Sequence, residues 1–146
     1  MKFQGTVDIG APRGRVWAFL MDPNEVGPCG PGVESVEVVD ETHFRAKAKV
    51  GIGFISARFS VAMEIAERDE PNRAVIKARG QAPGSAVDAS ATMALRDGAA
   101  GGTVMDWDAD VLIGGTIASV GARLIEGTAN KMIAQTFDCI RSKLEA

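Results

Sequence analysis

The C-terminal stretch from Thr116 to Leu144 constrains the fold more than any other part of the sequence. It contains no proline, and its apolar residues recur at intervals of three and four, the spacing of a helix that buries one face. At 1.5 Å rise per residue, such a helix spans roughly 40 Å, the width of a small domain. Gly114 and Gly115 separate it from the preceding segment, and Thr116 is a candidate N-cap. The residues of the stripe are Ile117, Val120, Leu124, Ile125, Thr128, Met132, Ile133, Phe137, Ile140 and Leu144.

Small residues interrupt this stripe on the face that must pack against the rest of the protein. They are Gly121, Thr128 and Ala129. A glycine inside a helix costs about 0.5–1 kcal/mol relative to alanine, so we expect something to offset it. Close packing on a sheet is one explanation, and room left for a ligand is the other.

Length and composition indicate one domain, residues 1–146, with 46% hydrophobic residues to build a core. The net charge is −3 and no basic block exceeds two adjacent charges, which argues against nucleic acid as a main partner. The first residues, Met1 to Gly5, lack the apolar core of a signal peptide. No stretch reaches the roughly 18 uncharged apolar residues of a membrane span. We therefore expect a cytoplasmic protein.

The sequence offers little material for catalysis or metal binding. Cys29 and Cys139 have no metal-ligand spacing, and two cysteines alone do not imply a disulfide framework, so we expect reduced thiols. His43, the only histidine, is predicted to point outward from a strand. No general base is predicted inside a cleft. We accordingly predict no catalytic residue, no cofactor and no metal site.

From residue 33 to residue 111 the apolar pattern has a period of two, which predicts six consecutive strands. A seventh strand is expected at residues 3–9, and Pro12 then opens a short helix. Residues 25–32 are rich in glycine and proline and allow at most one further helical turn. The apolar face of such a meander needs a cover, and only the C-terminal helix is long enough. We predict an α+β fold in which a curved seven-stranded antiparallel sheet wraps around that helix, with two short helices after the first strand.

The inward rows of the predicted strands alternate bulky with small side chains, as with Phe59 beside Ala57. Small residues on both sheet and helix predict unfilled space between them. Because natural cores pack to a density of about 0.74, persistent space indicates a ligand or a larger relative. We predict one apolar cavity, and its lining residues are Phe59, Val61, Ala91, Met93, Met105, Trp107, Gly121, Leu124, Ile125 and Thr128.

Several segments, taken in order along nearly the whole chain, resemble a known family. They are Ala11-Pro12 with Val16-Trp17, Asp22-Pro23, Pro31 to Ser35, Val50-Gly51 with Ile55 to Phe59, and Arg123 to Lys131. The Pro-Gly-Val-Glu-Ser, Ile-Ser-Ala-Arg-Phe and Arg-Leu-Ile-Glu-Gly-Thr-Ala segments are the more specific ones. Together they resemble the carbon monoxide dehydrogenase G-subunit family, within the START-like (SRPBCC, helix-grip, polyketide cyclase-like) superfamily.

The resemblance implies a deep hydrophobic cavity under the long helix of a helix-grip fold. It also implies a non-enzymatic accessory role beside a molybdenum hydroxylase of the carbon monoxide dehydrogenase type. Members are linked to membrane recruitment of that enzyme and to carriage of an isoprenoid quinone. Some carry a Pro-rich tail and a terminal membrane segment. This sequence ends at Ala146, so we expect membrane contact to be at most peripheral, at the inner face.

Two other functions stay open at this point. The first is a cyclase- or hydrolase-like enzyme of the same fold, against which stands the lack of inward His, Asp, Glu or Tyr. The second is a module without ligand that docks on another protein through the outer face of the long helix.

Overall fold

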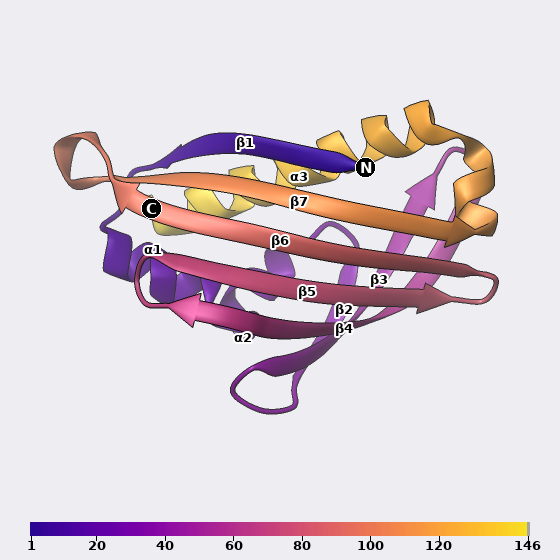
Figure 1. Cartoon of the computed structure of the whole chain (residues 1–146), viewed down its shortest axis with the longest axis horizontal. Helices are drawn as coiled ribbons and strands as arrows, with labels where there is room; N and C mark the ends of the chain where they lie inside the picture. Colours follow the sequence, from indigo (N-terminus) through magenta and orange to yellow (C-terminus); the bar gives the residue numbers. More distant parts are fainter. Residues whose placement is uncertain (146) are drawn as a thin grey trace.

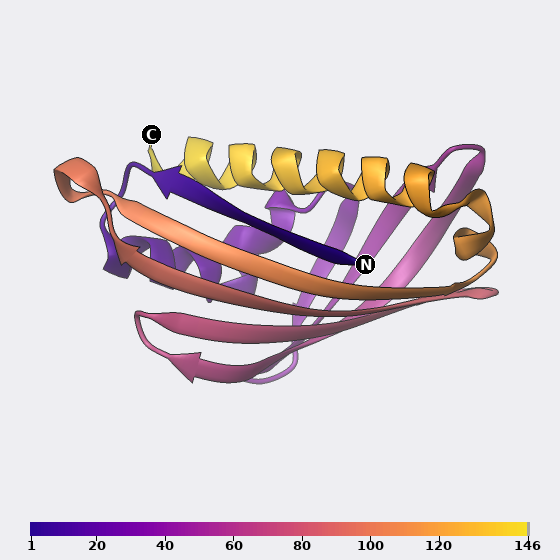
Figure 2. The ribbon, with the colours of Figure 1, turned by 45° about the horizontal axis from the view of Figure 1, so that its top comes forward.

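One curved antiparallel sheet forms the body of the protein and wraps around a long helix (Figures 1 and 2). The structure, a computed structural model, describes residues 1–145. The strand order is β1-β7-β6-β5-β4-β3-β2, so six strands follow one another as hairpins and the first strand pairs with the last. The strands are β1 (Lys2–Ile9), β2 (Val33–Val38), β3 (His43–Ile52), β4 (Ile55–Asp69), β5 (Arg73–Ala82), β6 (Ser85–Asp97) and β7 (Thr103–Gly115).

Alternation of apolar and polar residues explains why these segments are strands. In β4, Phe59 is buried while its neighbours Arg58 and Ser60 are exposed. A register shift between β4 and β5, at Ile65 to Glu67, marks a bulge. The predicted seven-stranded antiparallel sheet is confirmed.

Two short helices follow β1, as predicted, and cover one end of the sheet. Pro12 immediately precedes the first, and Pro23 begins the second, where its fixed backbone angle suits a helix start. The Asp22 carboxylate accepts a hydrogen bond from the Asn24 backbone N–H and caps that second helix. The helices, including three short 3₁₀ turns, are α1 (Arg13–Leu20), α2 (Pro23–Val26), η1 (Gly27–Cys29), η2 (Ala99–Gly101), η3 (Thr116–Val120) and α3 (Ala122–Leu144).

The C-terminal helix starts later than its apolar spacing indicates. Residues 116–120 form the 3₁₀ turn η3, and Gly121, with φ of 98° and ψ of 148°, separates it from α3. Only glycine adopts such a backbone conformation readily. The backbone N–H of Thr116 donates to the Gly84 carbonyl, so η3 is held by the β5–β6 turn. The predictions that Thr116 caps the helix and that Gly121 lies inside it are therefore wrong.

The larger of two hydrophobic core clusters in residues 1–145, the filled core, occupies one end of the space between the sheet and α3. The smaller one is built on Ile52, Phe59 and Ile117. Helix α1 follows β1 directly, and β1 pairs with β7 so that Ile9 lies opposite Thr103. The helix therefore covers the start of β7 and the end of β6. The buried apolar residues of the filled core include Ile9, Val16, Trp17, Leu95, Met105, Ile140 and Leu144.

A disulfide between Cys29 and Cys139 joins η1 to α3, with the two Cα atoms 5.4 Å apart. That separation is ordinary for a disulfide. The expectation of two reduced thiols is therefore wrong. Because 110 residues separate the two cysteines in sequence, nothing in their local spacing indicated the pairing.

Candidate functional site: an apolar cavity between sheet and helix

An apolar cavity of about 510 Å³ lies between the sheet and α3, beyond the filled core. Its walls come from β2 to β7, from η3, from α3, and from the loop that follows η1. No charged residue and no histidine is among the described residues that line it. The cavity therefore suits a hydrophobic molecule rather than a charged one.

Small side chains from both walls account for the space. The sheet contributes alanines and one glycine, and α3 contributes Ala129. At Gly80, a Cβ atom would meet Phe59 at 3.5 Å, so even an alanine there would begin to fill the space. The small lining residues are Ala48, Ala78, Gly80, Ala89, Ala109 and Ala129.

Trp107 contributes its indole ring to the cavity wall. Its indole ring packs against Phe137 of α3, with ring centroids 5.4 Å apart. It also lies over Gly5 of the neighbouring strand, where a Cβ atom would come within 3.0 Å of the indole nitrogen. That nitrogen, Nε1, is the one buried side-chain N or O atom in residues 1–145 without a hydrogen-bond partner. Gly5 covers this nitrogen and does not line the cavity, so the indole contributes its ring to the cavity wall and keeps its N–H out of it.

The other polar side-chain groups of the cavity wall are hydroxyls. The Thr136 hydroxyl donates to the Met132 carbonyl one helical turn earlier, at 2.8 Å. Thr128 is the other lining residue with a hydroxyl. The polar groups of the cavity are therefore few and are separated along its length.

Half of the predicted lining residues lie at the cavity and half do not. Phe59, Val61, Trp107, Ile125 and Thr128 line it. That they bind a ligand remains a prediction.

The remaining predicted residues lie elsewhere for identifiable reasons. Met105 is 1% exposed inside the filled core, and Met93 packs against that core, because α1 covers this end of the sheet. Ala91 is half-buried and does not line the cavity. Gly121 and Leu124 border a shallow surface depression instead, because the 3₁₀ turn rotates the start of α3 relative to a continuous helix.

Other lining residues were missed by the sequence reasoning. Those on the sheet lie on the same inward rows, displaced toward the end of the sheet that α1 does not cover, and Met132 lies on α3. The connection of α1 to β1 could have indicated which end is open. The missed residues include Val50, Ile52, Val87, Val111, Ile113 and Met132.

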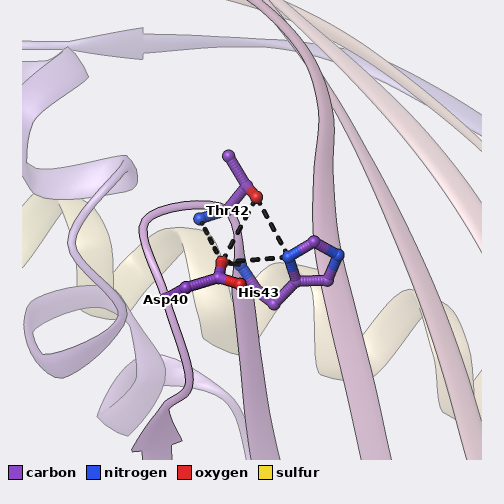
Figure 3. Close-up of polar contacts among 3 residues, drawn as sticks. All are labelled: Asp40, Thr42 and His43. Atoms are coloured by element: carbon purple, nitrogen blue, oxygen red, sulfur yellow. Dashed lines mark hydrogen bonds and ion pairs between the residues drawn. The ribbon is translucent and has the colours of Figure 1, made fainter.

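The single histidine lies in an exposed turn and does not line the cavity. Its imidazole Nδ1 lies 2.9 Å from the Asp40 carboxylate, and the Thr42 hydroxyl lies beside both groups (Figure 3). Hydrogen bonds from the Thr42 backbone N–H and from His43 lower the pKa of Asp40 from 3.8 to about 2. The cluster closes the β2–β3 turn. Within residues 1–145, no group of three or more His, Cys, Asp or Glu side chains is placed to hold a metal ion.

A curved sheet that grips a long helix is the START-like, helix-grip fold. The fold matches a conserved protein from Geobacillus kaustophilus with a TM-score of 0.92 and 22% identity, over 99% of this chain and 95% of that one. It matches the Zhui aromatase/cyclase from Streptomyces sp. R1128 with a TM-score of 0.72 and 18% identity, over 99% and 93%. It also matches a START superfamily protein from Mycobacterium smegmatis, with a TM-score of 0.72 and 13% identity, over 99% of this chain and 97% of that one.

Residues 5–145 match the model of the CoxG family, named for the G subunit of carbon monoxide dehydrogenase, and the chain belongs to that family. A search of curated proteins gave no significant match. Family and fold together indicate a ligand-binding accessory role. In residues 1–145, no helix is long and apolar enough to cross a membrane.

Proposed function

We propose that this protein is a non-enzymatic carrier that binds an isoprenoid quinone or a similar hydrophobic molecule in the cavity. The observation that carries the proposal is a cavity wall that is apolar almost throughout, with small side chains on both sheet and helix and no charged residue among the described lining residues. An apolar ligand gains about 25 cal/mol for each Å² removed from water. An isoprenoid quinone presents mostly hydrocarbon surface, which suits a wall of this kind. The volume lies within the range of about 300–1,000 Å³ usual for small-molecule sites.

Family membership indicates which enzyme the carrier would serve. The family takes its description from carbon monoxide dehydrogenase, so we propose that the carrier serves a molybdenum hydroxylase of that type. A cytoplasmic location stays a prediction. The Cys29–Cys139 disulfide counts against a reducing compartment, because disulfides persist mainly in oxidising environments.

The enzyme alternative takes support from the shared fold of the Zhui aromatase/cyclase. General acid–base catalysis, however, needs a titratable side chain within hydrogen-bond reach of the substrate. No Asp, Glu, His, Lys or Tyr is among the described lining residues, which favours binding over turnover.

Filling the cavity tests the carrier proposal. Ala129→Leu adds three carbon atoms to the cavity wall, and the control Ala134→Leu makes the same change on the exposed face of the same helix. Binding of a short-chain ubiquinone or menaquinone is followed by isothermal titration calorimetry. We expect Ala129→Leu to fold normally and to bind at least tenfold more weakly, while Ala134→Leu binds like the parent. Equal binding by both variants, or no quinone binding by the parent, would overturn the proposal.

A further inference from the structure

A short segment that contains η1 and leads into β2 has the cavity on one side and solvent on the other. We call these residues, 27–32, the strap; their sequence is Gly-Pro-Cys-Gly-Pro-Gly. Gly30 and Pro31 line the cavity, whereas Pro28 and Gly32 are exposed. The strap is therefore a thin part of the cavity wall, and a movement of the strap alone would open the cavity to solvent there.

The end of the strap next to β2 is tied to the sheet. The backbone N–H of Lys49 on β3 donates to the Gly32 carbonyl at 2.9 Å. Gly32 has a φ of 78°, and a Cβ atom at this position would clash with the Lys49 carbonyl oxygen, so the close contact requires glycine. This attachment to β3 does not involve the disulfide.

The Cys29–Cys139 disulfide ties the strap to α3 on the other side of the gap. Within residues 1–145, no backbone hydrogen bond joins the strap to α3. Apart from Cys29, the strap consists of glycine and proline, so it has little side-chain surface to pack on the helix. Segments with few buried apolar contacts open at a low cost in free energy. The covalent bond is thus the main attachment of the strap to α3.

We propose that the strap is a thiol-operated gate: exchange of the cavity's ligand is slow while Cys29 and Cys139 are bonded and fast once they are reduced. With both ends attached, the segment from Cys29 to Gly32 reaches at most about 10 Å and cannot leave the gap between α3 and β3. With only Gly32 attached, rotation at the strap's glycines moves Gly30 and Pro31 out of the wall, as hinge residues do in other lids. The purpose of the gate, release of cargo where thiols are reduced, rests on the proposed carrier function.

The reductant that opens the gate is a dithiol. Cys139 is half-buried and Cys29 is buried, so a thiolate of the dithiol attacks Cys139 Sγ. A new S–S bond forms there, the Cys29–Cys139 bond breaks, and its electron pair leaves on Cys29 Sγ, which takes up a proton. The second thiol of the reductant then displaces Cys139, which also takes up a proton, and the reductant leaves as a cyclic disulfide. Two electrons and two protons pass to the protein.

The test measures release of Nile red, a neutral apolar dye, from the intact chain into excess cyclodextrin, with and without dithiothreitol. We expect reduction to raise the release rate constant of the parent at least about tenfold. Cys29→Ala with Cys139→Ala should release the dye at the fast rate in both buffers. The control Leu144→Ala removes a buried side chain from the filled core, weakens the fold without touching the disulfide, and should respond to dithiothreitol like the parent.

Hydrogen exchange without any ligand separates movement of the strap from general loosening of the fold. Reduction should remove the protection of the amides of residues 27–33 and leave measurable protection in β5, β6 and α3. Oxidised Leu144→Ala should keep the strap amides as protected as they are in the oxidised parent.

Three results would overturn the gate: equally fast release before and after reduction, release from oxidised Leu144→Ala as fast as from the reduced parent, or a strap that stays protected after reduction. Calorimetric titration with quinone distinguishes the two proposals. Redox-dependent dye release from a protein that binds no quinone supports the gate and overturns the quinone carrier alone. Quinone binding with dye release that does not respond to reduction overturns the gate alone, and a parent that binds neither dye nor quinone overturns both.

Discussion

Removal of the Cys29–Cys139 disulfide should destabilise the protein substantially and loosen one wall of the cavity. The disulfide ties η1 to α3, and Gly30 and Pro31, which follow η1, line the cavity together with residues of α3. The perturbation is the double variant Cys29→Ala, Cys139→Ala. Alanine is chosen over serine because Cys29 is buried in the apolar core, where a new hydroxyl would add a cost of its own.

The magnitude follows from the length of chain that the disulfide closes. With a sequence separation of 110 residues, the loss of entropy in the unfolded chain corresponds to about 5 kcal/mol at 25 °C. Measured losses for native disulfides are typically about 2–5 kcal/mol. Because whole domains are stable by about 5–15 kcal/mol, the disulfide supplies a large share of the net stability.

The assay is equilibrium urea unfolding of the parent and the double variant, each with and without dithiothreitol. We expect the reductant to lower the free energy of unfolding of the parent to the level of the variant and to leave the variant unchanged. Quinone affinity should fall in the variant, because the η1 wall is no longer tied to α3. A parent that unfolds identically in both buffers, or that shows two alkylatable thiols by mass spectrometry, would refute the reasoning.

Three further predictions concern single residues. Trp107→Phe keeps an aromatic ring in the cavity wall and removes an N–H that Gly5 covers, so quinone affinity should stay within about twofold of the parent in parallel titrations; a tenfold loss would show that the indole N–H bonds the ligand. Leu124→Ala should cost less than about 1 kcal/mol in urea unfolding, because Leu124 is exposed rather than part of the core; a loss of the roughly 2–5 kcal/mol typical of buried leucine would contradict this placement. The pKa of Asp40 is lowered in the folded state, so its stabilising contribution is complete above the unfolded value of 3.8 and is lost as the pH falls toward about 2. An NMR titration of the Asp40 carboxyl carbon should give that low midpoint, and Asp40→Asn should remove this part of the acid dependence of unfolding.

The strands were predictable because each has one buried and one exposed face, which fixes a period of two. The start of α3 was not predictable. A 3₁₀ turn has three residues per turn, so it places Ile117 and Val120 at a spacing that an α-helix also allows. Only the glycine at position 121 distinguishes a 3₁₀ turn followed by a helix from one continuous helix, and the presence of a glycine does not reveal its backbone angles.

The position of the cavity was harder to predict than its existence. Met93 and Val87 lie on the same inward row of β6, yet Met93 packs against the filled core and Val87 lines the cavity. What separates them is α1, which is tied to the end of β1 and so covers one end of the sheet only. Alternation is a local property, whereas the filling of a core depends on elements that are distant in sequence.

The volume of the cavity bears on which function the fold supports. The space of about 510 Å³ is open to solvent in part, so water occupies it when no ligand is bound. Water against a wall with few polar groups makes few hydrogen bonds to it. Its release by a bound apolar molecule gains about 25 cal/mol for each Å² of apolar surface covered. This gain is available to a carrier and not to a docking module that binds nothing in the cavity.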